Sequence, residues 1–147
     1  MDLIRFMEVD EQNFYKCLEL SVTDEQSQYV AANVFSIAQA YVYEAWTPLC
    51  IYYDDQLIGF TLYGIDPDDK EVWIIRFMID KQVQNRGFGK LAMIKLLGII
   101  EQHYRCSKIR LGTKPENAVA QKLYEGVGFK NTGKMIEGEL LFEKQLY

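Results

Sequence analysis

The amino-acid sequence predicts a mixed α/β fold, in which helices cover one sheet without the regular strand–helix alternation of a parallel α/β protein. The first observation is the order of predicted elements: strand, helix, helix, three strands, helix, strand, helix and two strands. The second is a change of apolar periodicity from two to 3.6 residues after the three central strands. The third is composition, because 147 residues with 49% hydrophobic and 25% charged side chains suffice for one core. We therefore expect one domain over residues 1–147.

The first part of the chain predicts a strand and two helices. Residues 3–9 are short, partly alternating and rich in strand formers. Asp10 then fits as the N-cap of a helix over residues 11–20. A second helix is predicted over residues 33–46, until Thr47 and Pro48 stop it. The apolar faces of the two helices are predicted at Phe14, Cys17 and Leu18, and at Val34, Ile37, Ala38, Tyr41 and Ala45.

The middle of the chain predicts an antiparallel meander and then a long helix. Residues 49–65 contain two β-rich runs around an Asp-Asp-Gln turn, and residues 71–80 form a third run after a turn at 66–70. The aspartates of both segments are assigned to hairpin turns. The long helix begins near Gly87. Its apolar face is predicted at Leu91, Ile94, Leu97 and Ile100.

The last part of the chain predicts a strand, a helix and two strands. The strand covers residues 107–113, and the helix covers 116–129 and is ended by Gly126 and Gly128. Residues 129–134 and 138–146 form the terminal pair. The result is a mixed, mostly antiparallel sheet with about four helices.

Charge and cysteine content limit the function classes. A net charge of -5 argues against nucleic acid as the main partner and is compatible with a cationic small molecule. The first residues are acidic where a signal peptide is basic, and no run reaches the ~18 apolar residues that cross a bilayer. We therefore expect a cytoplasmic protein with no membrane partner. Cys17, Cys50 and Cys106 are odd in number and widely spaced, which indicates reduced thiols rather than disulfides or a metal site.

The most informative local pattern is the glycine-containing turn over residues 84–90, between the third strand of the meander and the long helix. Gly87 and Gly89 let backbone N–H groups approach a ligand closely, and the helix start adds roughly half a positive charge. Arg86 and Lys90 beside that positive end indicate a bound anion such as a diphosphate. The alternative is that the two glycines only shape a turn and bind no ligand. The dinucleotide and P-loop patterns fail, since a six-residue loop follows the strand and Leu91 stands where a P-loop has Ser or Thr.

This turn resembles the Q/R-x-x-G-x-G/A motif of the GNAT family of N-acetyltransferases. Residues 117–129 resemble the family's second segment, N-x-x-A-x-x-x-Y-x-x-x-G-F. The element order is also that of the family. The resemblance implies an acyl-coenzyme A N-acyltransferase fold, with acetyl-CoA as co-substrate and no metal. The matching residues are Gln84, Gly87, Gly89, Asn117, Ala120, Tyr124, Gly128 and Phe129.

The resemblance also implies roles for individual residues. Backbone amides of the turn would hold the coenzyme A diphosphate, and Met78 and Ile79 would contact the pantetheine through the strand backbone. Tyr124 would be the acid that protonates the departing thiolate, with plain core packing as its alternative role. Asn117 lies seven residues earlier on the same helical face and also fits as an N-cap. The predicted cofactor-binding residues are Met78, Ile79, Gln84, Asn85, Arg86, Gly87, Phe88, Gly89, Lys90, Asn117, Lys122 and Tyr124.

The sequence departs from the family pattern at the group that takes the proton from the amine. Polyamine-acetylating relatives carry a glutamate in the middle of this strand, whereas residues 73–77 read Trp-Ile-Ile-Arg-Phe. Glu71, acting through water, is the predicted base. Arg76 is placed on the strand face of Ile74 and Met78, in a salt bridge or orienting an acidic partner. The other candidates for the base are Glu25, Glu44 and Glu139.

Residues 24–46 resemble the substrate-lining helices of the family's bacterial spermine/spermidine acetyltransferases. Carboxylates and aromatic faces bind polycations, and each aromatic contact is worth ~0.5 to 2 kcal/mol. We therefore predict acetyl transfer to a polyamine; a peptide or aminoglycoside amine, or a non-catalytic acyl-CoA sensor, remains an alternative. A homodimer that pairs through an exposed sheet edge at residues 138–146 is a further expectation. The predicted substrate-binding residues are Glu25, Tyr29, Glu44, Trp73 and Arg76.

Overall fold

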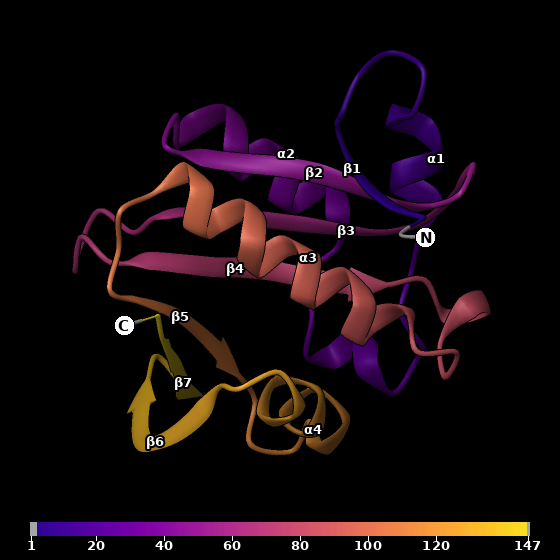
Figure 1. Ribbon diagram of the computed structural model, residues 1–147. Coiled ribbons are helices and arrows are strands. Elements are labelled where there is room, and N and C mark those ends of the chain that lie inside the picture. Colours follow the sequence, from indigo (N-terminus) through magenta and orange to yellow (C-terminus); the bar gives the residue numbers. More distant parts are fainter. Residues whose placement is uncertain (1–2, 147) are drawn as a thin grey trace.

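The computed structural model describes residues 3–146, which form four α-helices and seven strands (Figure 1). Short 3-10 turns at Gln26–Gln28 and Lys81–Val83 precede α2 and α3. The α/β class and the element order predicted from the sequence are confirmed. The elements are β1 (Ile4–Glu8), α1 (Phe14–Glu19), α2 (Asn33–Val42), β2 (Trp46–Tyr53), β3 (Gln56–Ile65), β4 (Val72–Ile79), α3 (Phe88–His103), β5 (Lys108–Thr113), α4 (Ala118–Gly126), β6 (Lys130–Ile136) and β7 (Glu139–Gln145).

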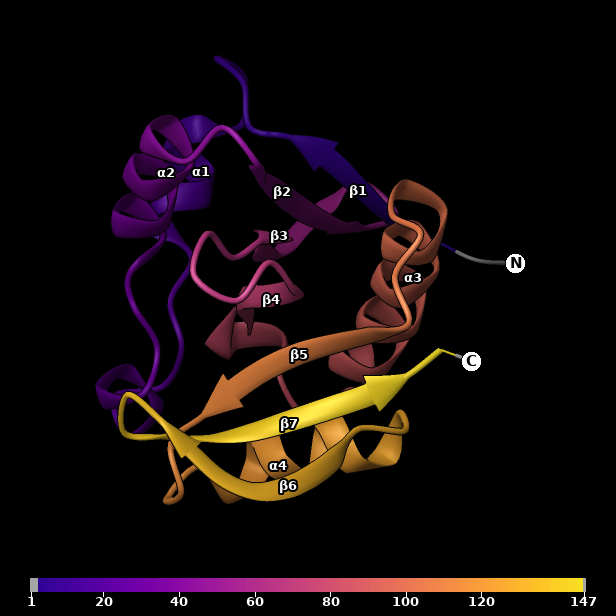
Figure 2. The ribbon, with the colours of Figure 1, turned by 90° about the vertical axis from the view of Figure 1, so that its left-hand side faces the viewer.

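The strands form one twisted sheet in the order β1-β2-β3-β4-β5-β7-β6. Within residues 3–146, β4 and β5 are the parallel pair and the other neighbours are antiparallel. Figure 2 shows α1 and α2 on one face of the sheet and α3 on the other. The fourth helix packs on the side of α3, because Tyr124 shares a core cluster with Leu96 and Ile100.

A bulge in β4 separates two parts of the sheet. Leu62 of β3 is paired with Arg76 and Tyr63 with Ile74, so Ile75 is an extra residue. The parallel ladder with β5 covers Val72 to Ile74, and in the described chain it does not continue beyond that point. The two strands therefore diverge after the bulge, and the far half of β4 is open on its β5 side. This divergence creates the space in which the site lies.

Several helix boundaries differ from the sequence prediction, and α4 (Ala118–Gly126) is shorter at both ends than the predicted 116–129. The first helix starts at Phe14, because the Asp10 carboxylate accepts hydrogen bonds from the N–H groups of Gln12 and Asn13 and closes a turn before it. The second helix ends at Val42 rather than near residue 46. Pro48 lies inside β2, beyond the last pair with β1, so its missing N–H removes no bond from that ladder.

The predicted apolar faces of two helices are partly wrong. Leu91 and Ile94 are each 52% exposed, and the core-facing side of α3 is rotated away from them. On α2, Val34 and Tyr41 point outward, although the prediction placed them on the buried face. Short periodic patterns fit more than one face, and packing selects among them. The buried residues of α3 are Phe88, Ala92, Met93, Leu96, Leu97 and Ile100.

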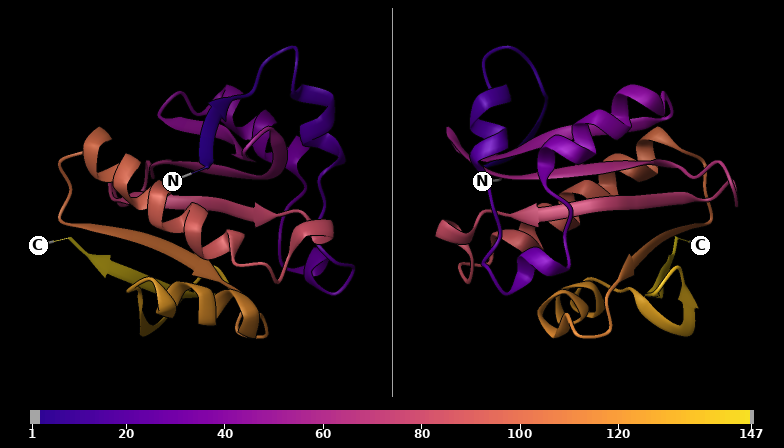
Figure 3. Two further views of the ribbon diagram at one scale, coloured as in Figure 1. Left: turned by 45° about the vertical axis from the view of Figure 1, so that its right-hand side comes forward. Right: turned by 180° about the vertical axis from the view of Figure 1, so that it is seen from behind.

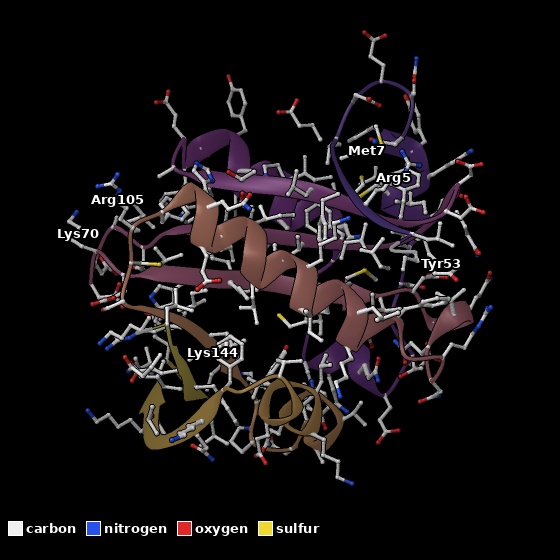
Figure 4. The ribbon with its side chains drawn as sticks, viewed as in Figure 1. Arg5, Met7, Tyr53, Lys70, Arg105 and Lys144 are labelled. Carbon is white, nitrogen blue, oxygen red and sulfur yellow. The ribbon has the colours of Figure 1, made fainter. Side chains whose placement is uncertain are left out.

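The two edges of the sheet are β1 and β6. Figure 4 shows Arg5 and Met7 on the β1 edge. Lys144 belongs to β7, which lies between β5 and β6 and is therefore not an edge strand. The prediction that residues 138–146 supply an exposed edge is therefore wrong, because β7 is paired on both sides. No helix in residues 3–146 is long and apolar enough to cross a membrane. The three cysteines are free thiols, two buried and Cys106 partly buried.

Candidate active site

The turn after β4 is held in place by side chains from both of its ends. The Asp80 carboxylate caps the 3-10 turn by accepting from the Gln82 N–H, and it also accepts from the Ser21 N–H at 2.9 Å. The Gln84 amide donates to the carbonyl of Ile79 and to the Oε1 of Gln26, each at 2.9 Å. The predicted ligand-binding turn is therefore fixed against the open end of β4.

Backbone conformation in this turn presents N–H groups at the start of α3. Asn85 and Gly87 have left-handed backbones, with φ of 63° and 84°, on either side of Arg86. Gly87 is the N-cap of α3 and makes no side-chain cap, so the N–H groups of the first helical turn lack intrahelical partners. A Cβ at Gly87 would have no described atom within 4 Å, so its φ, rather than crowding, favours glycine. Such a helix start suits a phosphate group.

A cavity of about 280 Å³ connects this turn with the far half of β4 and with α4. It is lined by the predicted cofactor-binding residues with two exceptions among the described residues, Arg86 and Lys122. The Arg86 guanidinium lies over the Phe88 ring, 5.0 Å from its centroid, and Lys122 is exposed on α4. The lining includes Met78, Ile79, Gln84, Asn85, Gly87, Phe88, Gly89, Lys90, Asn117 and Tyr124, together with Gln26, Val30 and Leu123.

Tyr124 and Asn117 lie together on one side of α4, as predicted. Asn117 caps the helix, because its Oδ1 accepts from the Ala120 N–H at 3.3 Å. Tyr124 is 9% exposed, and its ring meets those of Phe129 and Phe142 edge-on, with centroids 6.1 Å apart in both cases. Burial, with a smaller contribution from the Glu139 charge, raises the pKa of Tyr124 to about 12. The hydroxyl therefore keeps its proton at neutral pH and can donate a hydrogen bond.

Two further cavities continue from Tyr124 towards the β3–β4 turn. The second, of about 270 Å³, shares Asn117, Tyr124, Val30 and Phe77 with the first. The third, of about 420 Å³, shares Arg76 and Glu139 with the second. The three cavities thus adjoin one another, with Tyr124 at the first junction. Acidic and aromatic side chains of the third cavity are Asp66, Asp68, Asp69, Glu137, Glu139, Trp46 and Trp73.

The side chain of Glu139 passes over Gly112 to reach these cavities. It is the first residue of β7, and its Oε1 lies 2.8 Å from where a Cβ of Gly112 on β5 would be. Only the missing side chain at Gly112 allows this approach. The negative charge of Glu139 acts on two neighbours: it adds to the burial effect that raises the pKa of Tyr124, and it partly offsets the desolvation that lowers the pKa of Arg76. Glu139 is therefore a carboxylate within electrostatic range of Tyr124.

Arg76 faces α2 rather than the side of Ile74. The bulge at Ile75 breaks the alternation of β4, so Ile74 packs in the cluster under α3 while Met78 packs in the cluster with Cys17. The Arg76 guanidinium donates to the Ile75 carbonyl at 2.8 Å and to the Gln39 amide oxygen at 3.3 Å. Its Nε is buried without a hydrogen-bond partner within residues 3–146.

The electrostatics of Arg76 also differ from the predicted salt bridge. In the described chain Arg76 forms no ion pair within 4.0 Å. Desolvation lowers the pKa of this guanidinium, and the charge of Glu139 partly opposes that effect. Arg76 thus brings a positive charge to the junction of the second and third cavities.

Several predicted residues lie elsewhere. The Glu71 carboxylate pairs with Lys108 at 3.9 Å and, among the described residues, is not part of the lining of these three cavities. Glu25 and Glu44 are exposed and also lie outside that lining. Tyr29 lines the second cavity and Trp73 the third.

The sequence argument missed the acidic wall of the third cavity, because it assigned the aspartates of residues 66–69 to a turn alone. It also gave Glu139 no preference over other glutamates. The one local signal was Gly112 in the middle of a predicted strand, which indicates close approach by another group without naming it. Among residues 3–146, no group of three or more His, Cys, Asp or Glu side chains is placed to hold a metal ion.

The sheet opens beside a glycine-capped helix start, and a buried tyrosine donor lies at the opening. This arrangement defines a group-transfer enzyme with a phosphate-bearing co-substrate. The family follows from comparison with known proteins. The model of the acetyltransferase (GNAT) family matches residues 10–129, and the chain belongs to that family.

One relative is the protein named probable spermine N(1)-acetyltransferase of Bacillus subtilis subsp. natto (strain BEST195). It is 31% identical over 150 residues, which cover 97% of this chain and 99% of that protein. Among solved structures, the spermidine N-acetyltransferase from Vibrio cholerae in complex with CoA and spermine has a TM-score of 0.75 at 16% identity, covering 96% of this chain and 93% of that one.

A second solved structure is an aminoglycoside acetyltransferase in complex with coenzyme A. Its TM-score is 0.80 at 15% identity, and the match covers 97% of this chain and 95% of that chain. At these identities the two solved structures show the shared fold alone.

Proposed function

We propose that this protein transfers the acetyl group of acetyl-CoA to a primary amine of a polyamine such as spermine or spermidine. The observation that carries the proposal is the row of three adjoining cavities, with a phosphate-binding helix start at one end and carboxylates and tryptophans at the other. The relative named for spermine acetylation, at 31% identity over nearly the whole chain, supports the same acceptor.

The co-substrate would occupy the first cavity. Its diphosphate would accept hydrogen bonds from the N–H groups of the turn and the first turn of α3, with Lys90 nearby. The pantetheine would pass along the open half of β4 at Met78 and Ile79, where backbone groups have lost their β5 partners. The thioester would then reach the junction at Tyr124. Arg86 and Lys122, outside the cavity, would meet phosphates that project from it.

Chemistry at the junction begins with a neutral amine. A free alkylamine has a pKa near ~10.4, so a base must remove its proton at neutral pH. We place Glu139 in this role instead of Glu71, because Glu139 lines the second and third cavities while Glu71 is paired with Lys108. Glu139, directly or through water, takes one proton from the ammonium and passes it to solvent. The neutral nitrogen then attacks the thioester carbon, the carbon–sulfur bond breaks with the sulfur leaving as a thiolate, and the second proton of the nitrogen passes to Glu139. A backbone N–H near Met78 would stabilise the oxyanion.

Tyr124 would stabilise the sulfur that leaves. A thiol has a pKa of ~8.5, which is roughly 3 to 4 units below the value of about 12 for Tyr124. Complete transfer of the phenolic proton to the thiolate would thus be uphill by roughly 4 to 5 kcal/mol. We therefore propose that Tyr124 donates a hydrogen bond to the developing thiolate, which lowers the barrier without requiring a tyrosinate intermediate.

The third cavity would hold the charged remainder of the polyamine. Asp66, Asp68 and Glu137 supply negative charge there, and Trp73 adds an aromatic face worth ~0.5 to 2 kcal/mol per ammonium group. Asp69 is already occupied, since it accepts from Arg110 at 3.2 Å and from the Trp73 indole at 2.9 Å. The positive charge of Arg76 near Tyr124 would disfavour a second ammonium at the reacting end.

The direct test measures thiol release from acetyl-CoA with spermine, spermidine, diamines, an aminoglycoside and peptides with a free amino terminus. We expect the highest kcat/KM for spermine or spermidine. Highest values for the aminoglycoside or a peptide would assign the site to that acceptor instead. Calorimetric binding of coenzyme A without turnover of any amine would favour the acyl-CoA sensor. The expected cytoplasmic location, and the exclusion of nucleic acid and membrane partners, rest on charge and composition and stay proposals.

A further inference from the structure

The inner side of the second helix mixes polar and apolar residues, since Ile37 and Ala40 pack against the core cluster that contains Cys17. The helix also buries the polar residues Asn33 and Ser36, which are 6% and 0% exposed. The Asn33 amide donates to the Cys17 carbonyl at 2.9 Å, whereas the Ser36 hydroxyl finds no partner in the described part of the chain. Val42 and Tyr41, by contrast, are 69% and 89% exposed. A surface helix normally carries polar residues on its outer side, so the exposed apolar side chains of α2 need an explanation outside the single chain.

The outward residues form one continuous apolar surface. Five positions span an arc of about 120° around the helix at 3.6 residues per turn. They run along two turns, and Figure 3 shows α2 on the outside of the sheet with no other element over it. We call this surface the α2 stripe; its members are Val34, Phe35, Ala38, Tyr41 and Val42.

We infer that the α2 stripe is where a second copy of this chain docks, with α2 packed against α2 about a two-fold axis. Asn33–Val42 contains no charged residue, although the chain carries a net charge of -5. Two copies repel through their charged surfaces, and an uncharged stripe is the place where that repulsion is weakest. A two-fold contact also requires a self-complementary patch, which an apolar helix face provides.

The size of the stripe agrees with a dimer of modest strength. With Tyr43, which is 41% exposed just after α2, it presents on the order of 600 Å² per copy. Two copies would bury about 1,200 Å², the lower end of stable interfaces. We therefore expect a dissociation constant in the micromolar range.

The sheet edge offers a weaker alternative. One of the two edge strands is β6, and its register with β7 is irregular between Asn131 and Met135. Lys130 and Lys134 on that strand discourage edge-to-edge pairing with a second copy. The α2 stripe has no such protection.

The test is sedimentation equilibrium over about 1 to 200 µM protein, a range that brackets a micromolar dimer. We expect the wild-type protein to shift from monomer to dimer across this range. Tyr41→Glu and Val42→Glu should each weaken the dimer at least about 100-fold, because the carboxylate would be buried without a partner. Ile94→Glu is the matched control, since it changes a residue that is 52% exposed on α3, across the sheet, and should leave association unchanged.

A cysteine variant supplies an independent readout. Ala38→Cys, in the middle of the stripe, should form a disulfide-linked dimer under mild oxidation, because a two-fold axis brings the two copies of this position together. Wild-type protein that stays monomeric at the highest concentration would overturn the inference. So would a dimer that both glutamate variants leave intact. This inference does not depend on the proposed enzymatic activity.

Discussion

Gly112→Ala tests whether the Glu139 carboxylate must lie where the structure places it. The added Cβ would be 2.8 Å from Glu139 Oε1, and ordinary contact begins at 3.4 Å. The carboxylate must therefore move by about 0.6 Å, which is inexpensive for the end of a flexible side chain. A misplacement of 1 Å at a catalytic group costs on the order of 100-fold, so we expect kcat to fall roughly ten- to thirtyfold. That loss corresponds to about 1.4 to 2 kcal/mol of activation free energy.

The Gly112→Ala variant should lose activity while keeping nearly its full stability. The main displacement is at the end of a side chain, and the Cβ of Glu139, at 3.3 Å, must move by only about 0.1 Å, so the melting temperature of Gly112→Ala should stay within a few degrees of the wild type. Gly98→Ala in α3 is the matched control, because a Cβ there would have no described atom within 4 Å. It should leave kcat unchanged and raise stability by roughly 0.5 to 1 kcal/mol. Turnover is measured by thiol release at saturating acetyl-CoA and spermine.

A double-mutant cycle identifies the cause of the loss. Glu139→Gln removes the proposed proton acceptor, so adding Gly112→Ala to that variant should produce no further decrease in kcat. Wild-type kcat in Gly112→Ala would refute the reasoning directly. An equal loss in both backgrounds would show that the glycine acts through something other than Glu139.

Two predictions concern Tyr124. Tyr124→Phe should lower kcat at least about tenfold while the calorimetric dissociation constant of coenzyme A changes less than about threefold, since a hydrogen bond to the departing sulfur acts mainly in the transition state; an unchanged kcat would exclude that role. The second prediction is a loss of stability at high pH. The pKa of Tyr124 is raised to about 12 in the folded state against ~10 unfolded, so its contribution is complete below pH 10 and is lost between pH 10 and 12, by roughly 2 to 3 kcal/mol. Denaturant titration of wild type and Tyr124→Phe should show the weaker pH dependence in the variant, and equal slopes would contradict the assigned burial effect.

The sequence by itself determined the element order and the position of the glycine-containing turn before α3. Both follow from short-range patterns, because alternation and helical spacing report on segments of about ten residues and a positive backbone φ is encoded by the glycine that adopts it. Asn117 and Tyr124 could be placed on one helical face for the same reason, since seven residues make about two turns. These features needed no knowledge of what lies next to each segment.

Tertiary structure decided the faces and the partners. One extra residue at Ile75 turns Arg76 towards α2, and such a bulge depends on pairing with β3 rather than on the strand's own sequence. Glu139 comes beside Tyr124 because β7 pairs with β5 in the register that sets Leu141 opposite Gly112. The outward apolar surface of α2 likewise follows from what the sheet leaves uncovered. Register and packing are set by contacts between distant segments, whose free energies no local pattern contains.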